Sequence, residues 1–285
     1  MEKATLNGVE LQYEVTGSGE PVLFISPGPI TDGFLPLVNE EALARFRLIR
    51  YRQRRIGSGT NGDAAMSFVQ HAADAAALLG HLGIARAHIA GHSTGADIAL
   101  QLAADRPDLV HTLALLEPLL LFVPGAPAFL EKAAPALTAY AAGDRAEAMR
   151  SFLCLASSLN WTHFSALIEQ HVPGGVAQAL NDADNVFAGY VPALGAWQFG
   201  RDQTARITQP VLSVLGTSTD PLFIECNDLL HAWFPQLEVC RIADVAHLLQ
   251  LQNPEPVARG LAGFFTRHPI TRESSSAQHA TALQQ

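Results

Sequence analysis

The pentapeptide Gly91-His92-Ser93-Thr94-Gly95 has the spacing of a nucleophilic serine held in a sharp turn. It follows an apolar strand expected at 87–90 and precedes a helix expected at 94–104. In that setting the glycines allow a tight reversal, the hydroxyl projects above a sheet, and the helix N-terminus directs N–H groups at a developing oxyanion. The pattern predicts that Ser93 attacks a carbonyl carbon, while His92 packs beneath the turn.

A serine hydroxyl is a weak nucleophile unless an imidazole takes its proton. His247 is the expected base, because it follows a strand expected at 237–242. A carboxylate must hold the other ring nitrogen, and two residues compete for that role. Glu117 closes an apolar strand expected at 112–116, and Asp220 follows a strand expected at 210–215. We favour Glu117, because a charged side chain at the end of an apolar strand needs a partner.

Short apolar strands alternating with helices must position these groups. Besides the strands named above, strands are expected at 9–15, 21–25 and 47–51, and helices at 34–45 and 64–82. Such alternation builds a mostly parallel sheet covered on both faces. The predicted fold class is therefore α/β, with a mostly parallel doubly wound sheet.

Three segments carry a resemblance to the α/β-hydrolase family, which extends over nearly all of residues 1–268. They are the Ser93 pentapeptide, the segment 51–59, and Ala243–His247 followed by Asn253-Pro254-Glu255. Arg52 and Arg55 depart from the family pattern, where an aspartate and a glycine are usual. The resemblance implies an α/β-hydrolase fold with a serine, histidine and acid triad.

The resemblance bears on the choice of acid. The family usually places it three residues after a glycine, where this chain has Thr219, so that Asp220 is one residue late. The place of Glu117 resembles that of the acid in the pancreatic lipase branch and in the lactone hydrolases that act on zearalenone. The alternative roles are a turn cap beside Pro221 for Asp220, and for Glu117 an ion pair with an arginine of the loop at 52–55.

In the family the oxyanion usually rests on the N–H after the nucleophile and on an N–H from the loop after the third strand. The first is Thr94. The loop reads Ser26-Pro27-Gly28-Pro29-Ile30, and a proline has no N–H. The second donor is therefore Gly28 or Ile30, and we expect Gly28.

The helical segment between 119 and 202 is expected to form a cap inserted into the sheet domain. The predicted domains are a hydrolase core at 1–118 and 203–268, the cap at 119–202, and a disordered tail at 269–285. We expect most of the cap aromatics to pack the cap onto the core and some to face a ligand. They are Phe122, Phe129, Phe152, Trp161, Phe164, Phe187, Tyr190, Trp197 and Phe199.

Composition excludes several classes of function. The chain has 285 residues, 48% of them hydrophobic, and a net charge of −9. An acidic chain has no general attraction for nucleic acid or anionic membranes, and no apolar stretch is long enough to span a bilayer. The three separated cysteines are expected to be buried reduced thiols, which fits a cytoplasmic protein.

No metal-ligand spacing or phosphate loop stands out, so no cofactor or metal is expected. We therefore predict a serine hydrolase that cleaves a hydrophobic small-molecule ester or lactone. The alternatives are a carbon–carbon bond hydrolase acting on ring-cleavage products, a cofactor-free perhydrolase or haloperoxidase, and a noncatalytic ligand-binding relative. Whether the chain forms a homodimer is left open by the sequence.

Overall fold

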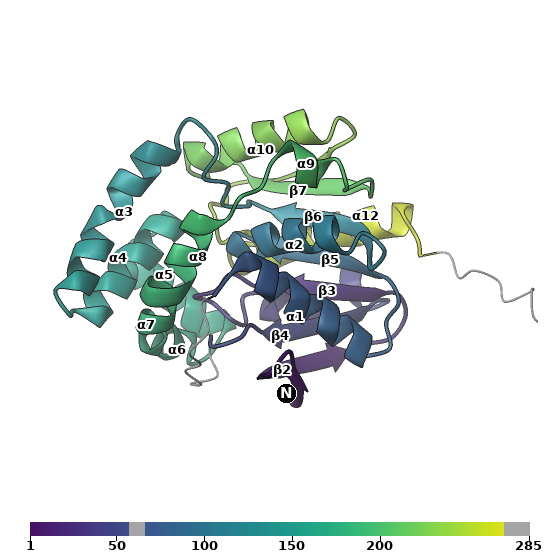
Figure 1. Ribbon diagram of the computed structural model, residues 1–285, viewed down its shortest axis with the longest axis horizontal. Coiled ribbons are helices and arrows are strands. Elements are labelled where there is room, and N and C mark those ends of the chain that lie inside the picture. The colour runs from purple at the N-terminus through teal and green to yellow at the C-terminus, as the bar shows by residue number, and fades with distance from the viewer. Residues whose placement is uncertain (57–65, 271–285) are drawn as a thin grey trace, which may run out of the picture.

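The computed structural model describes residues 1–56 and 66–270, in which an eight-stranded sheet forms the centre (Figure 1). The spatial order is β1-β2-β4-β3-β5-β6-β7-β8. The pairs β1–β2 and β2–β4 are antiparallel, and all later pairs are parallel. The strands are β1 (Glu2–Leu6), β2 (Val9–Thr16), β3 (Pro21–Ile25), β4 (Arg47–Arg52), β5 (Ala87–His92), β6 (Val110–Leu116), β7 (Val211–Gly216) and β8 (Glu238–Ile242). The predicted α/β fold is confirmed, although β1 was not expected.

Helices cover both faces of this sheet. The core helices are α1 (Phe68–His81), α2 (Thr94–Asp105), α10 (Pro221–Trp233), α11 (Leu249–Gln252) and α12 (Pro254–Arg267). The helix expected at 34–45 is wrong: two short 3-10 helices, η1 (Leu35–Asn39) and η2 (Glu41–Leu43), replace it. The extended backbone of Glu40 separates them, because an extended residue cannot continue a helix.

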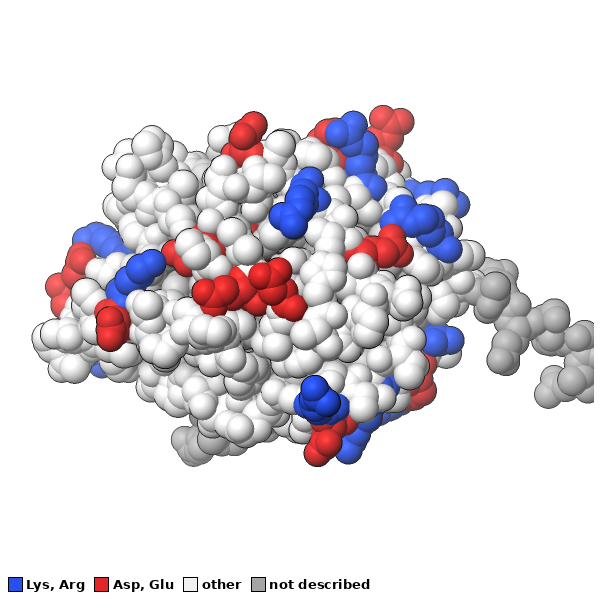
Figure 2. All heavy atoms as spheres, turned by 90° about the horizontal axis from the view of Figure 1, so that it is seen from above, with Lys and Arg blue, Asp and Glu red and all other residues white. Residues whose placement is uncertain are grey.

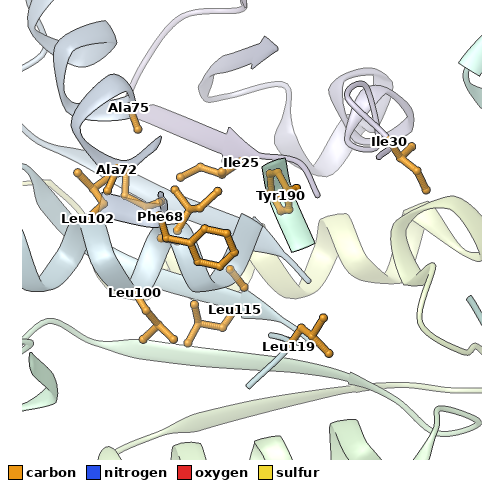
Figure 3. Packing of buried hydrophobic residues seen from close by; sticks show 14 of the residues in the cluster. Ile25, Ile30, Phe68, Ala72, Ala75, Leu100, Leu102, Leu115, Leu119 and Tyr190 are labelled. Carbon is orange, nitrogen blue, oxygen red and sulfur yellow. The ribbon is translucent and has the colours of Figure 1, made fainter. Parts of the chain in front are cut away.

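The alternation of apolar residues in β3 shows why both faces must be covered. Leu23 and Ile25 belong to a cluster that α1 and α2 share, whereas Val22 and Phe24 belong to a second cluster with α12. Successive side chains of a strand point to opposite faces, so a strand that is apolar throughout needs packing on both. Figure 3 shows part of the first cluster, with Phe68 of α1 near Ile25.

A helical insertion joins β6 to β7. Its elements are α3 (Ala126–Ala141), α4 (Arg145–Ser157), α5 (Trp161–His171), α6 (Gly175–Asn181), α7 (Ala183–Asn185), the π-helical turn η3 (Val186–Tyr190), α8 (Val191–Ala196) and α9 (Arg201–Thr204). In Figure 1 the elements α3 to α8, which we call the cap helices, lie together to one side of the sheet. The cap at 119–202 remains our proposal for this segment.

Arginines of β4 and of the loop that follows it are paired with carboxylates. Arg50 and Arg52 pair with Asp32, and Arg54 pairs with Asp74. Figure 2, which looks down on the side drawn uppermost in Figure 1, shows charged residues of both signs scattered among uncharged ones. In the part of the chain that is described, no helix is long and apolar enough to cross a membrane.

The expectation for the cysteines needs correction, and two other segments cannot be compared with the structure. All three cysteines are free thiols, but only Cys226 is buried, whereas Cys154 and Cys240 are half-buried. Positions 57–59 of the segment compared with the family, and positions 271–285 of the expected tail, lie outside the described residues.

Candidate active site

Ser93 sits at a strained turn between β5 and α2. Its backbone has φ 54° and ψ −128°, a conformation that residues other than glycine rarely adopt. A Cβ on Gly95 would stand 2.1 Å from the carbonyl oxygen of Ile25, and one on Gly91 would stand 2.4 Å from that of Gly95. Only glycine fits at either position, so the two glycines are what let the chain reverse here and hold Ser93 above the sheet.

His247 and Glu117 are joined by a buried hydrogen bond. Nδ1 of His247 lies 2.8 Å from Oε2 of Glu117, and their side chains are 3% and 0% exposed. Because an ionised carboxylate can only accept, His247 carries its proton on Nδ1 and leaves Nε2 free to accept another. This is the tautomer that a general base for a serine hydroxyl requires.

The Glu117 carboxylate is held from two further directions. The backbone N–H of Gly216 donates to Oε1 at 2.8 Å, and the hydroxyl of Thr219 donates to Oε2 at 2.8 Å. Glu117 itself follows the last residue of β6 and has φ 43°, a backbone conformation that residues other than glycine rarely adopt. These contacts fix the carboxylate in one orientation toward His247.

Asp220 has a different environment. Its carboxylate accepts from the backbone N–H of Leu222 at 3.0 Å, which caps the start of α10, and pairs with Lys132 of the cap at 3.2 Å. Thr219, which stands where the family usually has its acid, instead supports Glu117. The geometry favours Glu117 over Asp220 as the orienting acid.

Ser93 and His247 line the same cavity. In the described chain no hydrogen bond within 3.5 Å joins the Ser93 hydroxyl to the imidazole. Contacts of this kind often tighten only when a substrate is bound. Ser93 and His247 therefore face the same cavity, but their side chains are not hydrogen-bonded to each other.

The two N–H groups expected to hold an oxyanion are differently placed. Thr94 is the first residue of α2, where backbone N–H groups have no partner within the helix. In the loop after β3, the N–H of Ile30 donates to the carbonyl of Pro27 at 3.2 Å. The Ile30 N–H is therefore engaged in that turn, while the Gly28 backbone lies against the Tyr190 hydroxyl. Gly28 as the second donor remains a prediction.

Two aromatic residues enclose the His247 imidazole. Phe223 of α10 stacks on it with ring centroids 4.0 Å apart and planes 12° apart, and His92 lies 4.7 Å away. Burial lowers the pKa of His92 well below its usual value, so its ring is neutral. Its Nδ1 accepts from Gln250 at 3.0 Å and its Nε2–H donates to the carbonyl of His247 at 2.8 Å. His92 is therefore more than packing, because it holds the histidine loop.

The cavity above Ser93 is narrow and apolar. The space open to a water-sized sphere is about 50 Å³, several times the ~10–15 Å³ that one water needs. Four of the cap aromatics face it, namely Phe129, Phe152, Phe164 and Tyr190. The remaining lining is Pro27, Pro29, Ile30, His92, Ser93, Thr94, Leu119, Leu153, Ala156, Ser157, Val186, Val191, Leu194, Phe223, His247 and Leu248.

Comparison with known protein families matches residues 27–254, well over half of the chain, to the family described as alpha/beta hydrolase fold. The chain belongs to this family. Among solved structures, this hydrolase is similar to Est816, described as an N-acyl homoserine lactone degrading enzyme, with 25% identity and a TM-score of 0.70 over 92% of this chain and 100% of that one.

Other relatives of this hydrolase differ in chemistry. A thermophilic esterase from Thermogutta terrifontis is 21% identical with a TM-score of 0.73, covering 94% of this chain and 99% of that one, and shows the shared fold. "Putative carbamate hydrolase RutD" of Azorhizobium caulinodans is 31% identical over 106 residues, 37% of this chain and 40% of RutD. The hydrolase thus spans less than half the length of this curated relative.

Sequence reasoning missed the supporting residues of the hydrolase site. Thr219 could have been found from its place in the loop, since it occupies the usual position of the acid. Phe223 could not have been found, because no residue near it in the sequence indicates that α10 packs on the loop that carries His247. Within 1–56 and 66–270, no group of three or more His, Cys, Asp or Glu side chains is arranged to hold a metal ion.

Proposed function

We propose that this hydrolase cleaves an apolar small-molecule ester or lactone through an acyl-enzyme intermediate on Ser93. The observation that carries the proposal is that Ser93 and His247, with Glu117 hydrogen-bonded behind the imidazole, open on one cavity with an almost wholly apolar lining. Such a cavity binds apolar groups and excludes water from the reacting atoms. The likeness to a lactone-degrading enzyme supports an acyl substrate.

In the proposed reaction Ser93 Oγ attacks the carbonyl carbon and His247 Nε2 takes the hydroxyl proton. The imidazolium is stabilised by Glu117, and the oxyanion rests on the N–H groups of Thr94 and Gly28, each contributing about 3 kcal/mol. His247 then protonates the leaving oxygen as the acyl–oxygen bond breaks. Water repeats the sequence and releases the acid, and a lactone yields a hydroxy acid.

A fluorophosphonate probe tests the nucleophile without knowledge of the substrate. We expect wild type to be labelled at Ser93, as shown by peptide mapping, and Ser93→Ala to be unlabelled. Ser157→Ala is the matched control, because Ser157 also lines the cavity but its hydroxyl donates to the carbonyl of Leu153. Labelling at another residue, or equal labelling of wild type and Ser93→Ala, would overturn the assignment.

Turnover of a series of p-nitrophenyl esters and aromatic lactones tests the substrate class. In an apolar cavity kcat/KM should rise by up to about fourfold per methylene until the acyl chain fills the space, from about 0.8 kcal/mol per buried CH₂. An equal response to all chain lengths, or faster turnover of a polar acyl group, would contradict an apolar substrate.

Carbamate hydrolysis is a second candidate, favoured by the partial likeness to RutD. It passes through the same kind of tetrahedral intermediate on the same groups. Including an aryl carbamate in the ester series distinguishes the two, because kcat/KM for the carbamate above that for the matched ester would favour this candidate. Saturable ligand binding without labelling or turnover would indicate a noncatalytic relative.

A further inference from the structure

Tyr190 brings a phenol from the cap to the loop expected to hold the oxyanion. It ends the π-helical turn η3, is 3% exposed, and lines the cavity together with Ser93. A Cβ on Gly28 would stand 2.8 Å from Cζ of Tyr190, the ring carbon that bears the hydroxyl. In Figure 3 the Tyr190 ring lies by the end of the strand that carries Ile25. The hydroxyl-bearing edge of the ring is therefore packed on Gly28.

The phenol keeps its proton and has a defined resting partner. Its hydroxyl donates to Oε1 of Gln53 at 3.0 Å, and Nε2 of Gln53 donates to the carbonyl of Ser26 at 2.6 Å. Burial raises the pKa of Tyr190 above its usual range, against the opposing effects of Thr94, Gln53 and the Gly28 backbone. At neutral pH it is an O–H donor beside Thr94 and Gly28, the two residues proposed to supply the oxyanion N–H groups.

We propose that the Tyr190 hydroxyl is a third hydrogen-bond donor to the oxyanion, supplied by the cap. The proposal rests on the acyl-transfer function proposed above. The O–H turns from Gln53 Oε1 toward the substrate oxygen, and no proton is transferred. As the tetrahedral intermediate collapses, the leaving group departs and the oxygen becomes a neutral carbonyl again, so the hydroxyl returns to Gln53.

This exchange acts on the transition state and not on the bound substrate. A neutral carbonyl accepts about as well as the amide oxygen of Gln53, so turning toward it gains little. An oxyanion accepts roughly twice as strongly as a neutral oxygen, which compensates for leaving Gln53 Oε1 without a donor. A contact that strengthens only in the transition state raises kcat and leaves KM unchanged.

Tyr190→Phe removes the hydroxyl and keeps the ring that packs on Gly28 and Phe68. We expect kcat for an ester, and the rate constant of fluorophosphonate labelling, to fall by about 10²-fold with KM unchanged. Tyr140→Phe is the matched control, because that cap hydroxyl donates to Asp184 and does not line the cavity. It should react like wild type.

A pair of inhibitors separates a donor from a structural role. An alkyl boronic acid forms a tetrahedral anion on the serine, whereas a neutral ketone of the same chain length resembles the substrate. Tyr190→Phe should weaken binding of the boronic acid by about 10²-fold and leave the affinity for the ketone unchanged. Equal weakening of both, or wild-type labelling of Tyr190→Phe, overturns the third donor alone. Failure of wild type to label at Ser93 overturns the proposed function, and this inference with it.

Discussion

Replacement of Glu117 by glutamine removes the charge behind His247 while preserving size. The Gly216 N–H, 2.8 Å from Oε1, keeps the glutamine oxygen on its own side. The glutamine NH₂ group then faces Nδ1 of His247, which must give up its proton and accept. The ring is forced into the tautomer with its proton on Nε2, the nitrogen that has to receive the proton of Ser93.

The expected loss is large because nothing can replace the carboxylate. Glu117 is 1% exposed, so water does not fill its role. The same change of carboxylate to amide in a serine protease triad lowers kcat about 10⁴-fold, which corresponds to about 5 kcal/mol of transition-state stabilisation. Since Glu117 does not line the cavity, KM should stay close to that of wild type.

The assay compares kcat for ester hydrolysis in Glu117→Gln and Asp220→Asn. Asparagine caps a helix about as well as aspartate, so the second variant keeps the start of α10 and should retain wild-type kcat and melting temperature. Retention of more than about a tenth of wild-type kcat by Glu117→Gln would refute the tautomer argument. A large loss in Asp220→Asn would transfer the role to Asp220.

Three further changes test neighbouring parts of the structure. Thr219→Val should lower kcat about tenfold, since a hydrogen bond to a charged group contributes about 1.5 kcal/mol; unchanged kcat argues against support of Glu117. Gly28→Ala places a methyl group 2.7–2.9 Å from the Tyr190 ring, and we expect a lower melting temperature and slower labelling, whereas wild-type values of both would show that the ring moves freely. Burial lowers the pKa of His71 to about 3, with the charges of nearby arginines adding to the effect, so stability present above the unfolded pKa of about 6.5 is lost as pH falls. At about pH 5 the His71→Phe variant should therefore avoid about 2 kcal/mol of the loss in unfolding free energy that wild type suffers. Urea unfolding measured across this pH range checks it, and the same pH dependence in both proteins would contradict the argument.

The parts of the site that were predictable are those encoded by consecutive residues. The turn at Ser93 depends on two glycines within five positions, and their close contacts with backbone atoms explain why the pattern is readable. The strand that ends at Leu116 was apolar enough to make Glu117 conspicuous. The helix expected at 34–45 failed, because apolar spacing there did not reveal the extended residue Glu40.

The sequence by itself determined the α/β sheet, the strained turn at Ser93 and the two candidates for the orienting acid, because these depend on local turn geometry and on apolar periodicity. Only the tertiary structure decided which atoms meet. Thr219 reaches Glu117 across 102 positions, and Tyr190 reaches Gln53 across 137. Hydrogen bonds between side chains so far apart are set by how strands and cap helices pack, and packing brings together residues whose own neighbours in the chain carry no sign of the contact.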